Sequence, residues 1–118
     1  MQLVYVITFV EDMAAGLAFY RDTLGLPLRF ASPGWAEFDT GATTLALHPS
    51  SQDNPSGVTR LGFRVPDMAA CRRQLAGAGV RFTREPAPEH GVLLAEFAGP
   101  AGARFSLSAP LEPGAAQR

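Results

Sequence analysis

Polar and apolar residues alternate, or follow a helical spacing, in an order that occurs twice along the chain. In the first copy, residues 3–10 alternate between two faces, and an apolar stripe of 4-3-4 spacing then runs from Met13 to Leu24. Residues three and four apart lie on one face of a helix, so the stripe predicts a helix with Asp12 as its N-cap and Gly25 as its stop. Three short strands are predicted after it, at residues 28–31, 35–39 and 43–48.

The second copy has the same order of elements. Residues 60–65 alternate as in a strand, and Asp67 is placed to cap a helix. The apolar stripe of this helix runs from Met68 through Cys71 to Ala78. Three further strands are predicted at residues 80–83, 92–98 and 104–108.

Two short identities accompany this order and indicate a duplicated unit. Asp-Met-Ala-Ala occurs at residues 12–15 and 67–70, and Ala-Glu-Phe occurs at 36–38 and 95–97. Each identity is weak alone, but both occupy matching places in the two copies. The chain is therefore interpreted as two βαβββ modules in tandem.

The predicted fold is α+β, in a single domain over residues 1–118. In each module the helix covers one face of a curled mixed sheet, and we expect the two sheets to face each other around a groove. Such a groove is the default ligand site. The predicted parts are a first module at about 1–48, a flexible connector at 49–57, a second module at about 58–109 and a tail at 110–118.

Composition and charge narrow the function classes. The chain has 118 residues, 47% of them hydrophobic and 18% charged, which is typical of a globular domain. Ten basic and eleven acidic residues give a net charge of -1, so we expect neither nucleic acid nor an anionic membrane as a partner. All ten basic residues are arginine, which excludes lysine chemistry. The apolar N-terminal stretch is too short to span a bilayer, and we expect a cytoplasmic protein.

Few side chains could carry redox, nucleophilic or metal chemistry. Cys71 is the single cysteine, which excludes an intramolecular disulfide, and on the helical stripe it is expected to pack as a small hydrophobe. A serine nucleophile needs a general base beside it, and the sequence offers no second plausible base for Ser106 or Ser108. His48 and His90 are the two histidines, which argues against a multi-histidine metal site.

Several stretches carry a resemblance to a known family. They are Val-Glu-Asp at 10–12, Leu-Ala-Phe-Tyr-Arg-Asp at 17–22, Leu-Gly at 24–25, Leu-Gly-Phe-Arg-Val-Pro-Asp at 61–67 and Gly-Pro-Ala-Gly at 99–102. With them, the sequence resembles the vicinal oxygen chelate superfamily over about residues 3–109. This superfamily includes glyoxalase I, extradiol dioxygenases, fosfomycin-modifying enzymes and bleomycin-resistance proteins, and it hosts many chemistries on one scaffold.

The resemblance implies where a metal site would lie. Metal enzymes of the superfamily take one ligand from each of four strands, commonly His or Gln, Glu, His and Glu. The matching positions here hold Tyr5, Ala46, Arg60 and Ser106. None of these is a normal ligand for Zn, Ni, Mn or Fe, and the Arg60 cation would repel a metal ion. We therefore expect no metal and no other cofactor.

A shifted metal site is the alternative. His48 lies two residues beyond Ala46 and so on the same face of its strand, and Glu37 and Glu96 occupy equivalent places in the two modules. These three side chains could form a rearranged site. Otherwise His48 is a strand-end residue, partly in solvent and hydrogen-bonded to the neighbouring loop.

Strand alternation also predicts which side chains line the groove. Tyr5 and Trp35 would offer stacking faces, Ala46 and Gly62 would create space, and Arg60 would offer a fork for an anion. The predicted ligand-binding residues are Tyr5, Ile7, Trp35, Glu37, Ala46, His48, Arg60, Gly62, Arg64, Glu96 and Ser106.

Two interpretations of these groove residues need no ligand. Charged side chains inside a protein must be paired, so Arg60, Arg64 and Arg104 could simply neutralise Glu37 and Glu96. In the same way, Trp35 could simply fill core volume.

The resulting interpretation is a metal-free protein of the glyoxalase/bleomycin-resistance type that binds a planar or anionic small organic molecule. The resemblance to the bleomycin-resistance branch implies sequestration of a drug, hence antibiotic resistance, without chemical change, and a homodimer. The alternative is a lyase or dioxygenase with a rearranged metal site, or a metal-free acid–base catalyst that uses Glu37, Glu96 or His48. A third possibility is a dimeric accessory protein with a vestigial cavity.

Overall fold

A computed structural model describes residues 1–112 and divides them into two compact units. One unit is Val4–Arg60, and the other consists of residues 1–3 and 61–112. The single-domain interpretation stays a prediction. Of the predicted tail at 110–118, residues 113–118 lie outside the described part of the chain.

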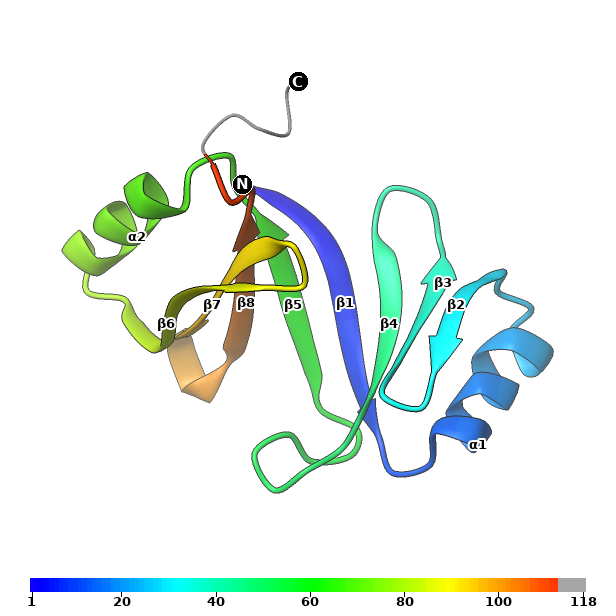
Figure 1. The fold of residues 1–118 in the computed structure, drawn as a ribbon. Coiled ribbons are helices and arrows are strands. Elements are labelled where there is room, and N and C mark those ends of the chain that lie inside the picture. Colours follow the sequence, from blue (N-terminus) through cyan, green and yellow to red (C-terminus); the bar gives the residue numbers. More distant parts are fainter. Residues whose placement is uncertain (113–118) are drawn as a thin grey trace. The chain divides into compact units, whose positions relative to one another are not determined.

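Both halves have the predicted βαβββ order (Figure 1). The first half consists of β1 (Gln2–Val10), α1 (Met13–Leu17), a π-helical segment η1 (Ala18–Thr23), β2 (Leu28–Ser32), β3 (Trp35–Asp39) and β4 (Thr44–Pro49). The second half consists of β5 (Thr59–Arg64), α2 (Met68–Gly77), β6 (Arg81–Glu89), β7 (Val92–Ala98), a 3-10 turn η2 (Pro100–Gly102) and β8 (Arg104–Ala109). None of the helices in residues 1–112 has the length and hydrophobicity needed to cross a bilayer.

The strands of each half form a mixed sheet, as expected. The order is β2-β3-β4-β1 in the first half and β5-β8-β7-β6 in the second. In each half one pair is parallel, β1 with β4 and β5 with β8, and the other pairs are antiparallel. The sheets are less curled than expected, because most of these strands have only five or six residues and twist accumulates along a strand. The groove between the modules stays a prediction.

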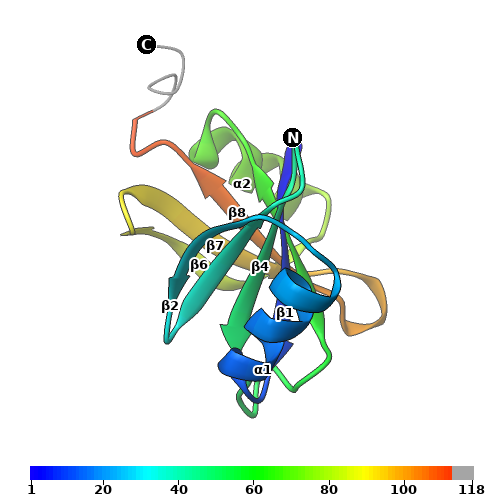
Figure 2. The same ribbon diagram turned by 90° about the vertical axis from the view of Figure 1, so that its right-hand side faces the viewer.

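In the first half, α1 covers one face of its sheet. Figure 2 looks onto α1 in front of β1 and β4. The buried core of this face consists of Ala36, Phe38 and Leu47, and Met13, Leu17 and Tyr20 pack against it. Gly16 permits this close packing, since a Cβ there would lie 3.1 Å from Cδ1 of Leu47.

The end of this helix differs from the prediction. Leu24, the last residue of the predicted stripe, is 54% exposed. The backbone N–H of Leu24 donates to the carbonyl of Phe19 at 2.9 Å, a π-type bond that spans five residues. A π turn contains more residues than an α turn, so Leu24 leaves the buried face. Gly25 then adopts a positive φ of +76°, which agrees with its predicted position at the stop of the helix.

The second half repeats the helix-on-sheet packing. Asp67 caps α2 by accepting a hydrogen bond from the backbone N–H of Ala70 at 3.1 Å. Met68 is buried, and Cys71 and Leu75 pack against the same core. Partial burial raises the pKa of the Cys71 thiol, so its interpretation as a small hydrophobe fits the structure. Ala78, at the C-cap, is exposed and does not belong to the buried stripe.

Strand β6 is longer than the predicted strand at 80–83. It continues to Glu89 through Pro86 and Pro88, two residues that usually end a strand. Proline is tolerated because β6 is the last strand in the order and pairs through one edge only, with β7. The pairing shifts register twice on the way, between Phe82 and Ala87.

The connector at 49–57 is tied to the end of β1. The backbone N–H of Ser50 donates to Val10 at 2.9 Å, and that of Gly57 donates to Phe9 at 2.9 Å. Phe9 in turn donates to Val58 at 3.1 Å. The two ends of the connector are therefore held beside the same pair of β1 residues.

The loop between β7 and β8 contains a glycine that the packing requires. A Cβ on Gly99 would lie 2.5 Å from Cε2 of Phe105, a ring that packs against the core of the second half. The neighbouring turn closes through a hydrogen bond from the N–H of Gly99 to Ala103 at 2.8 Å. A residue larger than glycine at position 99 would therefore force the Phe105 ring to move.

Gly99→Ala is expected to lower the free energy of unfolding by about 1–3 kcal/mol, because the added methyl group overpacks the Phe105 ring. The measurement is urea denaturation, with Gly34→Ala as the matched control. Gly34 lies in an open turn, and a methyl group added there would meet no atom within 4 Å. Equal stability of the two variants would contradict the close approach.

Candidate functional site

The candidate site of the first half lies on the sheet face opposite α1. Strand alternation places the side chains of Ala36, Phe38 and Leu47 under the helix, so their strand neighbours Trp35, Glu37, Ala46 and His48 take the other face. Ala46 is paired with Ile7 on one side and with Glu37 on the other. The face therefore combines aromatic, charged and small residues around one alanine.

Two residues that were expected to create space are buried. Ala46 has no exposed surface, and Gly62 of the second half is also buried. Small side chains were expected to leave an opening at these positions. The described residues instead enclose both of them.

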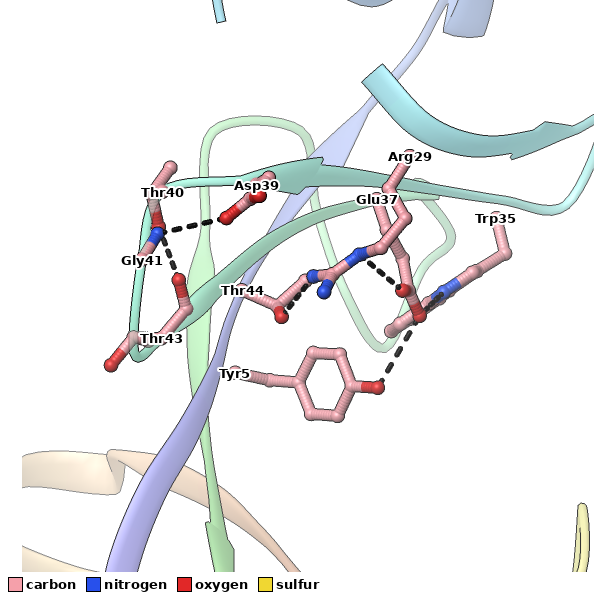
Figure 3. A network of polar contacts seen from close by, with 9 residues as sticks. All are labelled: Tyr5, Arg29, Trp35, Glu37, Asp39, Thr40, Gly41, Thr43 and Thr44. Carbon is pink, nitrogen blue, oxygen red and sulfur yellow. Dashed lines mark hydrogen bonds and ion pairs between the residues drawn. The ribbon is translucent and has the colours of Figure 1, made fainter. Parts of the chain in front are cut away.

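Glu37 is the centre of a polar network on this face (Figure 3). Its Oε2 atom accepts hydrogen bonds from the hydroxyl of Tyr5 at 3.3 Å and from the indole Nε1 of Trp35 at 2.8 Å. The Nε atom of Arg29 lies 3.5 Å from Oε1. One carboxylate thus fixes two aromatic rings from different strands and has an arginine as its counter-ion.

The sequence did not identify Arg29 as a site residue. This arginine comes from β2, and its Nη2 atom also donates to the hydroxyl of Thr44. The second half has an equivalent pair, in which Arg84 lies 3.8 Å from Glu96. Arg29 and Arg84 are 55 residues apart, the same offset as between the two helix-capping aspartates, so the duplication contained a signal for this pair.

The aromatic side chains of this face are in contact with one another. The rings of Tyr5 and Trp35 are 5.7 Å apart in an edge-to-face arrangement. Trp35 also meets His48 at 6.2 Å, and His48 meets Phe9 at 5.3 Å. Trp35 is half-buried and lies outside the core under α1, so it does not fill that core.

His48 is an exposed residue near the end of β4. Its Nδ1 atom lies 2.8 Å from the carbonyl oxygen of Pro49. A carbonyl only accepts hydrogen bonds, so Nδ1 is the donor in this contact. This geometry agrees with the interpretation of His48 as a strand-end residue bonded to the neighbouring loop.

Arg60 is buried at the start of β5, with 8% of its surface exposed. Its Nη2 atom donates to Oδ1 of Asn54 at 2.7 Å, and its guanidinium lies 5.6 Å from the centre of the Phe9 ring. Asn54 belongs to the connector and was not predicted as a partner. These contacts give Arg60 a structural role, whereas its role as an anion anchor stays a prediction.

The remaining predicted residues lie in the second half. Ser106 of β8 is paired with Gly62 of β5 and with Glu96 of β7. Arg64 is exposed at the end of β5. The structure thus brings Gly62, Ser106 and Glu96 together as one row across the second sheet. A single site that unites both halves stays a prediction.

Three of the four positions where the family's metal enzymes hold ligands do not fit a metal ion. Ala46 has no donor atom, the Tyr5 hydroxyl donates to Glu37, and the Arg60 guanidinium donates to Asn54. Within residues 1–112, no three His, Cys, Asp or Glu side chains are grouped so that they could hold a metal.

Arg60→Ala is expected to lower the free energy of unfolding of the ligand-free protein by about 1–3 kcal/mol, because Asn54 loses a charged partner. Thermal and urea unfolding measure the change, and Arg73→Ala, an exposed substitution on α2, is the control. Unchanged stability, together with lost binding of an anionic compound, would contradict the structural role and support the anion anchor.

The chain has similarities to known proteins. The model of the Glyoxalase/Bleomycin resistance protein/Dioxygenase superfamily matches residues 2–107. No curated protein matched. Among solved structures, NAD-dependent benzaldehyde dehydrogenase from Legionella pneumophila is 19% identical with a TM-score of 0.74, and the match covers 90% of this chain and 97% of that one.

Two epimerases have similar structures. Methylmalonyl-CoA epimerase from Mycobacterium tuberculosis is 22% identical with a TM-score of 0.72, over 99% of this chain and 92% of that one. The Streptomyces coelicolor enzyme, in complex with 2-nitronate-propionyl-CoA, is 18% identical with a TM-score of 0.74, over 96% of both chains. Identities this low show a shared fold and nothing about the ligand. With the family model matching nearly the whole described chain, the protein belongs to the Glyoxalase/Bleomycin resistance protein/Dioxygenase superfamily.

Proposed function

We propose that this chain binds a small, planar organic molecule without transforming it, on the sheet face that carries Tyr5 and Trp35. The observation that supports this most directly is the hydrogen bonding of both rings to one carboxylate, Glu37. A ring that is already fixed loses little conformational entropy when a ligand stacks on it. Glu37 therefore prepares an aromatic surface before any ligand arrives.

The chemistry of the neighbouring residues favours a flat ligand. Trp35 and Tyr5 offer extended π surfaces, and the edge-to-face contact between them holds the rings at an interplanar angle of 69°. The exposed ring of His48 lies beside Trp35. A planar molecule can contact these rings without moving the α1 core beneath the opposite face.

The proposal includes the location that the resemblance implies, a groove to which both modules contribute. In the second half, the row formed by Gly62, Ser106 and Glu96 would contribute polar contacts to such a ligand. An anionic group on the ligand would have to reach a buried guanidinium that already donates to Asn54. The proposal therefore depends on the aromatic pair rather than on Arg60.

The protein contains one tryptophan, which makes the proposal directly testable. Neutral and anionic fused-ring aromatic compounds are titrated while the single indole N–H signal of Trp35 is followed by NMR and the melting temperature is measured. Binding is expected to move this signal and raise the melting temperature. Trp35→Ala should weaken binding by at least about tenfold, because a central aromatic contact is lost.

Phe19→Ala is the matched control, since Phe19 is a 48% exposed ring on η1. It should leave the affinity unchanged. An affinity that is the same in Trp35→Ala as in the wild-type protein would contradict the proposed binding surface. About one transition metal per chain, together with turnover of a bound compound, would support the lyase or dioxygenase alternative. Turnover without metal would support acid–base catalysis.

We infer further that the chain forms a homodimer, as the resemblance implies. The terminal strand β2 exposes 37% of Leu28 and 52% of Phe30, and unprotected strand edges of this kind favour pairing. Light scattering at micromolar concentration is expected to give a mass near twice 12.5 kDa. A mass near 12.5 kDa over this range would exclude the dimer.

A further inference from the structure

The two oxygens of the Glu37 carboxylate are used unequally. A carboxylate has about four lone-pair sites for hydrogen bonds. Oε2 accepts two good bonds, from Tyr5 and Trp35. Oε1 has the Arg29 contact at 3.5 Å, which is longer than a good N–H···O bond. Oε1 therefore retains the capacity to accept a strong hydrogen bond.

Arg29 is held in place by a second partner. Its Nη2 atom donates to Thr44, and this bond directs the guanidinium along β4. The charge of Arg29 compensates that of Glu37 without closing off Oε1. Glu37 keeps 20% of its side chain exposed, so this residue is not sealed within the protein.

We propose that Glu37 determines ligand specificity: its Oε1 atom accepts a hydrogen bond from an N–H or O–H group at the edge of an uncharged, planar aromatic ligand whose ring lies against Trp35 and Tyr5. This inference rests on the proposed function, and it adds the class of ligand. A bond from a neutral donor to an ionised acceptor is stronger than a bond between neutral groups. The protein would thus select a ligand that has a hydrogen-bond donor at its edge as well as a flat shape.

The same geometry disfavours an anionic ligand at this position. A carboxylate on the ligand would meet the negative charge of Glu37, and like charges at contact distance repel. Arg29 could offset only part of this repulsion, because its guanidinium is already engaged by Glu37 and Thr44. This narrows the sequence-based expectation of a planar or anionic ligand to a planar, neutral one.

Three naphthalene compounds test this inference because they share one ring system. 2-Naphthol carries an O–H donor and is uncharged at neutral pH, because phenols titrate at about pH 10. 2-Methoxynaphthalene lacks the donor, and 2-naphthoate is an anion. Isothermal titration calorimetry of the full chain is expected to show that 2-naphthol binds about tenfold more tightly than either of the others.

Glu37→Gln is the decisive variant. Its single carbonyl oxygen would accept from Trp35 and Tyr5, which places the amide NH2 group where Oε1 was. The preference for 2-naphthol over 2-methoxynaphthalene should then disappear or reverse. A residue that only stabilised the fold would weaken both compounds equally. Glu85→Gln is the matched control, since Glu85 is also paired with an arginine, Arg72, but on the exposed surface.

Arg29→Gln provides a second variant if Glu37→Gln does not fold. Removing the counter-ion leaves the charge of Glu37 uncompensated, so binding of 2-naphthoate should fall further while 2-naphthol keeps its affinity within about threefold. A gain in 2-naphthoate binding would overturn the inference.

The outcomes separate this inference from the proposed function. Equal binding of the three compounds, or tighter binding of 2-naphthoate, overturns the donor specificity and leaves the binding function standing. A preference for 2-naphthol that survives in Glu37→Gln overturns the role of Glu37. If none of the three compounds binds to the wild-type protein, both the function and the inference fail.

Discussion

The packing of one helix on one face of a four-stranded sheet is the constraint from which the candidate site follows. In the first half, Phe38 and Leu47 are fully buried under α1. Successive residues of a strand point to opposite faces. Because Phe38 and Leu47 are buried under the helix, Glu37 and His48 must lie on the other face of the sheet. A register shift of one residue would move Glu37 into the apolar core, where a carboxylate is too costly to desolvate. Core packing therefore fixes where the polar network can form.

The duplication preserved this arrangement in both halves but not its chemistry. Glu37 and Glu96 occupy equivalent strand positions, and each has an arginine partner, Arg29 or Arg84, from the terminal strand of its half. The residue two positions before each glutamate differs: Trp35 in the first half corresponds to Leu94 in the second. An indole donates a hydrogen bond to a carboxylate and leucine cannot, so Trp35 gives Glu37 a bond that Leu94 cannot give Glu96.

The sequence predicted the elements and the two faces better than it predicted the contacts. Alternation placed Tyr5, Trp35 and Glu37 on one face correctly, because that depends on spacing alone. It could not identify the partner of Glu37, because an ion pair between strands depends on their pairing register, which spacing does not give. Arg29 was missed for this reason, although its repeat partner Arg84 offered a clue. The predicted burial of Leu24 is wrong because a stripe of 4-3-4 spacing is compatible with an α-helix. The spacing gives no sign of the π turn that rotates this residue into solvent.

The position of Tyr5 connects the family to the proposed specificity. Where the family's metal enzymes are expected to hold a first ligand, this chain has a phenol that donates a hydrogen bond to Glu37. A phenol in this bond supplies the carboxylate with a donor and supplies the surface with a ring, two properties that a metal-bound histidine would not combine. Ala46, at a second ligand position, contributes no polar atom and pairs directly with Glu37. Two of the four metal positions thus hold residues that lie beside one carboxylate, and this carboxylate in turn holds the rings of Tyr5 and Trp35.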